Sequence, residues 1–232
     1  MLISFFLMLF SINKKVLAQE KNKELGAWYM YFWSASLNDS KFGFQGDIQH
    51  RNWNLGSDLQ QLMLRAGATY KPLDNVKTTL GYAHILGGGM DDIGLVSHEH
   101  RIYQEALISQ KLGERVFLNH RYRFEQRWTT NRDTEAKAMR TRWRYAIFAN
   151  VPFNRKDLRK GAIYLAVYDE VFINGFTEIG DNELFGLFGV NRAYAALGYS
   201  ISDKIRVQAG YMRQITGSLN KGQLQLSLHQ SF

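Results

Sequence analysis

Apolar and polar residues alternate with a period of two along most of the chain. In the block 116–128, for example, Leu118, Tyr122 and Phe124 share one parity, and Arg123 and Glu125 share the other. Successive side chains of a β-strand point to opposite faces, so each such block predicts a strand with one apolar and one polar face. No helical periodicity persists along the chain. The pattern therefore predicts an all-β fold.

The length of the blocks distinguishes two kinds of all-β fold. The alternation recurs at 42–53, 59–70, 138–150, 161–173, 204–215 and 222–232, and turn-forming sequences occur at 71–75 (KPLDN), 111–115 (KLGER), 200–204 (SISDK) and 219–222 (LNKG). Strands of a soluble sandwich have about five to six residues, whereas strands that span a membrane need about nine to eleven. The blocks therefore favour a closed antiparallel transmembrane β-barrel of the outer-membrane type, with 10–12 strands.

The strand number depends on the segment 25–34 (LGAWYMYFWS), which is apolar on both faces. Ten strands fit residues 42–232, and single-chain bacterial barrels have an even number of strands. The segment is thus either a strand whose partner is not recognised, giving twelve, or an N-terminal segment associated with a ten-stranded barrel. Aromatic residues are expected to form the two interface girdles of such a barrel: Trp28, Trp33, Trp53, Trp128, Trp143, Tyr70, Tyr199 and Tyr211.

The lengths of the connections predict an orientation. Short turns at 71–75, 111–115 and 200–204 alternate with longer connections at 87–97, 129–137 and 174–187. Bacterial barrels place short turns in the periplasm and long loops outside. On this rule Phe232 lies at the periplasmic end.

The N-terminus carries the features of an export signal. The apolar run LISFFLMLF is too short to span a bilayer, and Val16, Leu17 and Ala18 are suited to signal-peptide cleavage before Gln19. We therefore expect a signal peptide at 1–18 and a single barrel domain at 19–232. Cleavage removes Lys14 and Lys15 and lowers the net charge from +8 to +6. Export argues against nucleic acid as a partner, and the absence of cysteine excludes disulfides and cysteine-based metal sites.

An ordered set of short segments resembles a known family. These are IQHRNW (48–53), QQLMLRAGATY (60–70), GYAH (81–84), EHRIYQE (99–105), NHRYRFEQR (119–127), TRWRY (141–145), YDEVFIN (168–174), NRAYAALGY (191–199) and GYMRQ (210–214). Together they resemble the Bacteroidota outer-membrane family called domain of unknown function 2490 (DUF2490). The resemblance implies an outer-membrane barrel with no established biochemical activity. The terminal Phe232 also resembles the signal by which barrel proteins are recognised for assembly, although Gln230 replaces the apolar residue often found there.

Charged residues of inward parity form the largest candidate constellation. The set is Arg51, Arg65, Glu99, Arg101, Glu105, Arg121, Arg123, Glu125, Arg127, Arg140, Arg142, Arg144, Glu170, Arg192 and Arg206. One hypothesis is a lumen network in which arginines pair with carboxylates on neighbouring strands. The other is an arginine-rich pore or pocket that favours anions. The two are compatible, and bound anions, lipid headgroups or loop carboxylates could balance the excess positive charge.

Residues 97–100 are a candidate catalytic or metal site, because Ser97, His98, Glu99 and His100 lie together near an outer loop. Neighbours along a strand point to opposite faces, so Ser97 and His98 do not form a nucleophile and base in regular geometry. His98 and His100 share a face but lack an evident third ligand. We therefore expect no catalytic, cofactor-binding or metal-binding residues.

The sequence thus predicts a porin-like outer-membrane barrel that passes or binds small anionic solutes, or serves as a membrane scaffold, without catalysis. The expected partners are outer-membrane lipid, the barrel-assembly machinery and small anions. Two alternatives stay open: an outer-membrane hydrolase or acyltransferase acting on lipid, and an accessory subunit of an envelope complex.

Overall fold

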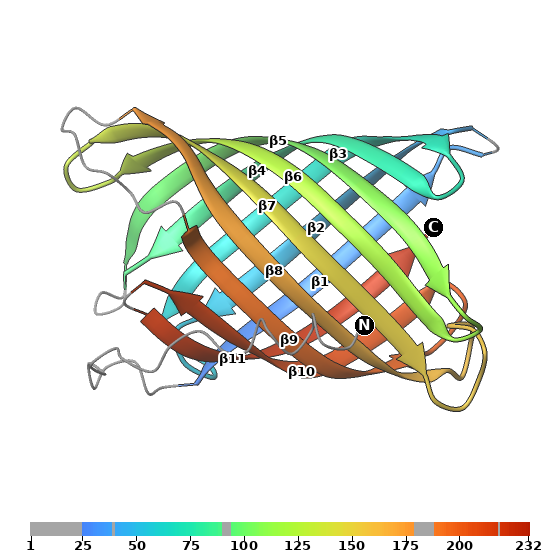
Figure 1. Ribbon diagram of the computed structural model, residues 1–232. Coiled ribbons are helices and arrows are strands. Elements are labelled where there is room, and N and C mark those ends of the chain that lie inside the picture. Colours follow the sequence, from blue (N-terminus) through green and yellow to red (C-terminus); the bar gives the residue numbers. More distant parts are fainter. Residues whose placement is uncertain (1–24, 39, 90–93, 179–187, 218) are drawn as a thin grey trace.

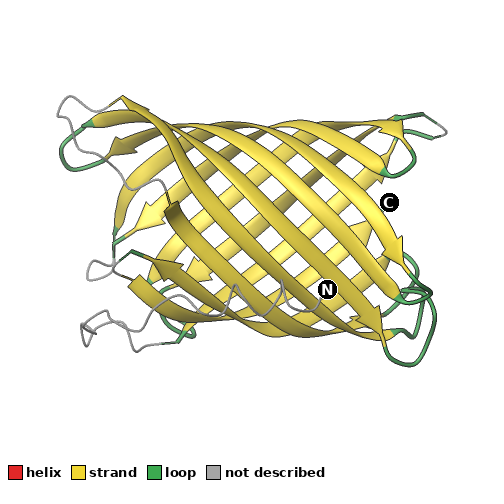
Figure 2. Cartoon of the chain, viewed as in Figure 1, coloured by secondary structure: helices red, strands yellow, loops and turns green. Residues whose placement is uncertain are grey.

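A computed structural model describes residues 25–38, 40–89, 94–178, 188–217 and 219–232, and these form a closed eleven-stranded β-barrel (Figure 1). The strands are β1 (Gly26–Ser36), β2 (Phe42–Asn52), β3 (Leu59–Leu73), β4 (Val76–Gly88), β5 (Leu95–Leu112), β6 (Val116–Asn131), β7 (Lys137–Pro152), β8 (Ile163–Glu178), β9 (Phe188–Ser200), β10 (Ile205–Thr216) and β11 (Leu219–Ser231). These residues contain no helix (Figure 2). In particular, no helix in the described ranges is long and apolar enough to cross a membrane. The predicted all-β closed barrel is confirmed.

The barrel closes through a parallel seam. Consecutive strands pair antiparallel from β1 to β11, whereas β1 and β11 pair parallel, with Tyr29 opposite Leu226 and Tyr31 opposite Leu228. When strand direction alternates, an odd number of strands makes the first and last strands run the same way. The segment 25–34 is therefore the closing strand itself. The strand number lies within the expected range, but the expectation of an even number is wrong.

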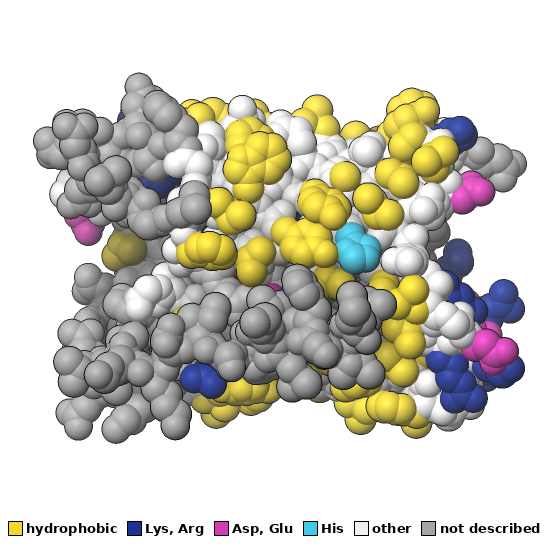
Figure 3. Space-filling view, viewed as in Figure 1, with side chains coloured by type: hydrophobic (Ala, Val, Ile, Leu, Met, Phe, Trp, Pro, Cys, Tyr) yellow, Lys and Arg dark blue, Asp and Glu magenta, His cyan; other side chains and the backbone are white. Residues whose placement is uncertain are grey.

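The two faces of the wall differ as the alternation predicts. Large apolar side chains are exposed on the outside of every region of the wall, among them Leu64, Leu80, Ile102, Trp143, Leu197 and Leu226. The space-filling view shows such side chains along the visible wall, with charged side chains gathered at one end (Figure 3). The side chains of Asp47, Arg101 and Glu125, which have the opposite parity, are buried in the interior. The exterior is thus apolar and the interior largely polar.

The connections differ less in length between the two ends than expected. The strands extend further than the sequence blocks, so the connections at one end shorten to 89–94, 132–136 and 179–187. At the other end, where the chain terminates, the connection 153–162 is long. The predicted turn at 219–222 is wrong, because Asn220, Lys221 and Gly222 pair with Ile215, Gln214 and Arg213 of β10 inside a strand ladder. The turns predicted at 71–75, 111–115 and 200–204 lie where β3, β5 and β9 end. Gly113, in the second of them, has a positive φ, which glycine tolerates.

The apolar core lies inside the barrel, on one side of the lumen. It contains Trp28, Tyr164, Ala166, Tyr194, Ala196 and Met212, with Met30 and Tyr168 packed against it. The expectation that Trp28 belongs to an interface girdle is wrong, because its side chain points inward and is almost fully buried. The predicted girdle positions Trp128, Trp143, Tyr70, Tyr199 and Tyr211 are exposed on the outer wall. Strands β1 and β8–β10 therefore give the lumen an apolar side.

We expect cysteines at Tyr31 and Leu228 to form a disulfide. These residues are partners in the parallel register of β1 and β11, and neighbouring strands lie about 4.8 Å apart, which suits a disulfide. The chain has no cysteine of its own, so Tyr31→Cys with Leu228→Cys can be oxidised and scored by a reductant-sensitive shift in electrophoretic mobility. The control pair, Tyr31→Cys with Leu224→Cys, is out of register and should not cross-link. Preferential cross-linking of the control pair would contradict this closure of the barrel.

Candidate functional site

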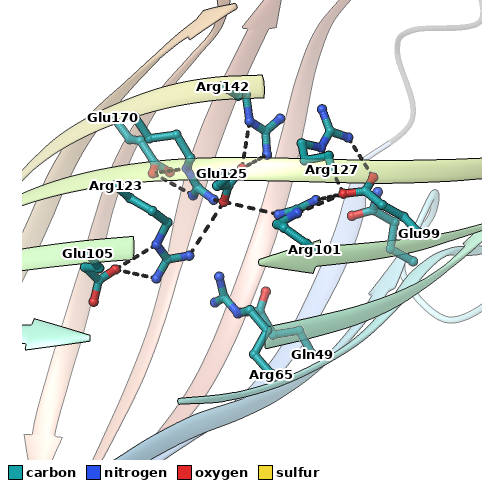
Figure 4. A network of polar contacts seen from close by, with 12 residues as sticks. Gln49, Arg65, Glu99, Arg101, Glu105, Arg123, Glu125, Arg127, Arg142 and Glu170 are labelled. Carbon is teal, nitrogen blue, oxygen red and sulfur yellow. Dashed lines mark hydrogen bonds and ion pairs between the residues drawn. The ribbon is translucent and has the colours of Figure 1, made fainter. Parts of the chain in front are cut away.

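The interior is organised around one carboxylate, Glu125 of β6, which is fully buried. Arg142 donates to its Oε2 from Nε and Nη2 at 2.9 and 2.5 Å, and Arg144 and Arg101 donate to Oε1 at 2.7 and 3.2 Å. Arg123 Nη1 lies 3.8 Å from the same Oε1. Figure 4 shows the guanidinium groups of Arg101, Arg123 and Arg142 converging on Glu125 from neighbouring strands. One glutamate is thus shared by four arginines.

Three more glutamates extend this ion network around the wall. Glu99 accepts hydrogen bonds from Arg101 at 2.6 and 2.8 Å and from Arg127 at 2.7 and 2.9 Å. The network then runs from Glu105, which pairs with Arg123 and lies 3.8 Å from Arg121, to Glu170. Glu170 accepts from Arg121 at 2.5 Å and from Arg144 at 2.6 and 2.8 Å, and lies 3.8 Å from Arg192. The ion network therefore crosses β5 to β9.

Aromatic rings complete the surroundings of these guanidinium groups. Arg142, Arg144 and Arg192 lie over the ring of Phe172, with Cζ at 4.9, 4.4 and 4.7 Å from its centroid. Arg123 lies over Tyr103 at 4.4 Å. A Cβ at Gly81 would overlap the ring of Tyr103, so the glycine makes room for this contact. Stacking suits arginine because its planar group is weakly hydrated.

The remaining members of the predicted set lie at the borders of the ion network. Arg65 pairs with Asp47 of β2 at 2.8 Å, a carboxylate absent from the predicted set although it has inward parity. Arg206 lines the lumen near the end where the chain terminates. Arg140 lies on β7, where its backbone pairs with that of Arg127. The sequence could have added Asp47 by parity alone.

Arg51 of β2 is buried and makes no ion pair with a carboxylate among the described residues. It donates two hydrogen bonds to Gln49 Oε1, at 3.1 and 2.5 Å, and one to Gln61 Oε1 at 2.9 Å. Its Cζ lies 3.8 Å from the ring centroid of Trp28, and that of Arg192 lies 4.9 Å from it. A guanidinium has five N–H groups, so two N–H groups of Arg51 have no protein acceptor among these residues.

A cavity of about 490 Å³ occupies the lumen between the ion network and the apolar side. Its rim includes Lys204 and Ser231, which are exposed at the end where the chain terminates. Its inner part reaches Arg51, Arg144 and Glu170. Beyond it, towards the other end, the lumen is filled by buried side chains such as Glu125, Met63 and Gln223. Within the described part of the chain the cavity is therefore blind.

The candidate catalytic residues at 97–100 lie on different faces of β5. Glu99 points into the ion network, whereas His98 and His100 lie on the outer wall, where the ring of His100 stacks on that of His84 with centroids 5.0 Å apart. Ser97 shares the inward parity of Glu99, so it does not meet His98 in the strand geometry. No group of three or more histidine, aspartate or glutamate side chains in the described ranges is arranged to hold a metal ion.

We expect Glu125→Gln to destabilise the barrel by about 3–5 kcal/mol, because it leaves buried arginines without their shared carboxylate. The control is Glu114→Gln, which removes a carboxylate from an exposed pair with Lys156 at 2.6 Å and should cost about 0–1 kcal/mol. Urea unfolding of both variants in detergent micelles measures the difference. Equal effects of the two substitutions would contradict a central role for Glu125.

Comparison with known proteins identifies the family. The family model described as protein of unknown function (DUF2490) matches residues 25–225. An uncharacterised protein of Methylorubrum extorquens is 31% identical over 188 residues, which cover 77% of this chain and 76% of that protein. No solved structure matches the chain. The resemblance to the family is confirmed, while its assignment to Bacteroidota stays a prediction. The chain belongs to the DUF2490 family of proteins of unknown function.

Proposed function

We propose that this protein is an outer-membrane β-barrel that binds small anions in its lumen, without catalysis. The observation that carries the proposal is the blind cavity with Arg51 in its wall, a buried cation that has free N–H groups and no carboxylate partner among the described residues. A second cation, Arg192, lies beside the ring of Trp28, as Arg51 does. Its nearest carboxylate oxygen, on Glu170, is 3.8 Å away. Converging donors of this kind suit an anionic ligand.

The apolar outer wall supports insertion in a membrane. Soluble monomers rarely expose contiguous apolar patches larger than a few hundred Å², yet here large apolar side chains cover the wall on strands as distant as β3, β7 and β11. A polar interior inside an apolar exterior is typical of outer-membrane barrels. The proposed signal peptide at 1–18 lies outside the described residues. Phe232, proposed as the assembly signal, is 63% exposed at the end of the chain.

Binding fits the interior better than free passage. An open pore needs a continuous path, and rings of charged residues then select the ion. Here the section beyond the cavity is occupied by Glu99 and Glu125 with Arg101, Arg127 and Arg142. Glu105 and Glu170 belong to the same ion network and line the cavity itself. Passage of a solute would require these buried ion pairs to separate, which is costly. The proposed role is therefore that of a binding barrel.

We expect Leu80→Arg, on the outer wall of β4, to destabilise the barrel in phospholipid vesicles by about 2–4 kcal/mol, because a charged side chain deep in a bilayer is costly. The matched control is Leu73→Arg at the end of β3, where the cost should be about 0–1 kcal/mol. The two leucines are 60% and 62% exposed, so exposure alone predicts equal effects. Unfolding free energies in vesicles compare them, and equal small costs would argue against membrane insertion.

We expect Arg51→Gln to weaken the binding of inorganic phosphate at least tenfold, since it removes a cation that has no carboxylate partner in the described residues. Arg213→Gln is the control, because Arg213 is exposed on the outer wall and bonds to Asn220 at 3.0 Å. Isothermal titration of the full mature chain in detergent measures both affinities. No phosphate binding by the unchanged protein would contradict the proposal, and a steady anion current in planar bilayers would show passage instead of binding.

A further inference from the structure

The cavity has two unlike walls, which together suggest a more specific ligand. On one side are the ion network and its bordering cations, including Arg65, Arg121 and Arg144. On the other side Trp28, Met30 and Phe32 face the lumen from β1. A lumen that only served inorganic ions would need no such apolar stripe.

The apolar stripe continues across the neighbouring strands. Tyr168 and Tyr194 stack with ring centroids 4.7 Å apart and line the same cavity. Met30 and Tyr168 pack against the buried cluster around Trp28 and Tyr194. Nearer the rim, Phe32 stacks on His229 at 4.8 Å. Rings and a thioether thus form a surface along one side of the cavity, from its inner part to its rim.

Hydrogen-bond donors lie where the two walls meet. Arg51 and Arg192 both contact the ring of Trp28, so their charges lie beside the apolar surface. Tyr194 also lines the cavity, and its hydroxyl is buried with no hydrogen-bond partner within the described ranges. Buried polar atoms normally have a partner, so this hydroxyl adds an unpaired polar atom to the cavity wall beside Arg51 and Arg192.

We infer that the cavity binds an organic anion with an apolar body, its carboxylate or phosphate group at Arg51 and Arg192 and its body against Met30, Phe32 and Tyr168. This inference rests on the proposed function and narrows its ligand class. A volume of about 490 Å³ lies within the range of about 300–1,000 Å³ that small-molecule pockets occupy, and such pockets combine apolar walls with a few placed polar groups. Lys204 and Arg206 at the rim carry the charge that would attract an anion from solvent.

The test compares three probes on the full mature chain in detergent, by isothermal titration with protein-free micelles as the blank. 1-Naphthoate carries both the carboxylate and an apolar body, acetate only the carboxylate, and 1-naphthylmethanol only the body. We expect 1-naphthoate to bind at least tenfold more tightly than either of the others. Met30→Gln should weaken naphthoate at least fivefold and leave acetate unchanged, whereas Met139→Gln on β7, outside the cavity, should change neither.

Several results would overturn the inference. If acetate binds as tightly as naphthoate and Met30→Gln has no effect, the cavity binds anions but the apolar wall is not part of the site, so the inference fails and the proposed function stands. If naphthylmethanol binds as tightly as naphthoate and Arg51→Gln has no effect, both fail. Phe32→Gln is the second variant should Met30→Gln not fold, and unchanged acetate binding reports a folded barrel for either one.

Discussion

The shared ion pairs around Glu125 are the constraint on which the interior depends. Four arginines from β5, β6 and β7 meet one fully buried carboxylate. Burial of a guanidinium is costly unless it is paired and hydrogen-bonded, so the arginines need Glu99, Glu105 and Glu170 as much as Glu125. Because each carboxylate is shared between strands, the ion network couples the register of one hairpin to that of the next. Its innermost part, around Glu125 and Arg101, is buried in the section of lumen that an open pore would leave to water.

The parallel seam explains why the lumen is asymmetric. A closing strand between β2 and β11 needs an apolar outer face, and β1 has one in Tyr29 and its neighbours. Its inner face could have carried more charge, but it carries Trp28, Met30 and Phe32 instead. These residues meet the tyrosines and alanines of β8 and β9, and the polar interior gains a continuous apolar side. Because β1 is apolar on both faces, it lacks the alternation that predicts the other strands. The same property gives the cavity its apolar wall.

Parity predicted much of the fold, because the period of two depends only on the local backbone. It placed Tyr122 outside and Arg123 and Glu125 inside before any pairing was known. Pairing itself depends on register between strands, so the sequence did not indicate which arginines share Glu125, or that Arg51 lacks a carboxylate. Parity also fails where both faces are apolar, as at Trp28.

At 219–222 the residues Asn220 and Gly222 have turn chemistry but lie inside a hairpin ladder, where tertiary pairing overrides local preference. His120, an outward residue on an apolar face, is satisfied by a neighbour that the sequence does not place beside it, since its Nδ1 lies 2.9 Å from the Tyr145 hydroxyl.

Arg51, a lumen cation without a carboxylate partner among the described residues, lies at the border of the ion network, beside Trp28. On β6 and β7, five guanidinium groups have a carboxylate oxygen within hydrogen-bond distance, namely Arg121, Arg123, Arg127, Arg142 and Arg144. Beside Arg51, the indole face of Trp28 takes the place of a carboxylate. A ring face attracts a cation without occupying its N–H groups. Arg51 therefore keeps donors that no described side chain accepts, and it keeps them at the boundary between the ionic and the apolar walls. If the protein's own carboxylates paired with every lumen cation, a cavity at this boundary would offer an anion no free donor. The free N–H groups of Arg51 lie in the cavity wall, between the ion network and the apolar wall, which is where a ligand with an anionic group and an apolar body would meet both.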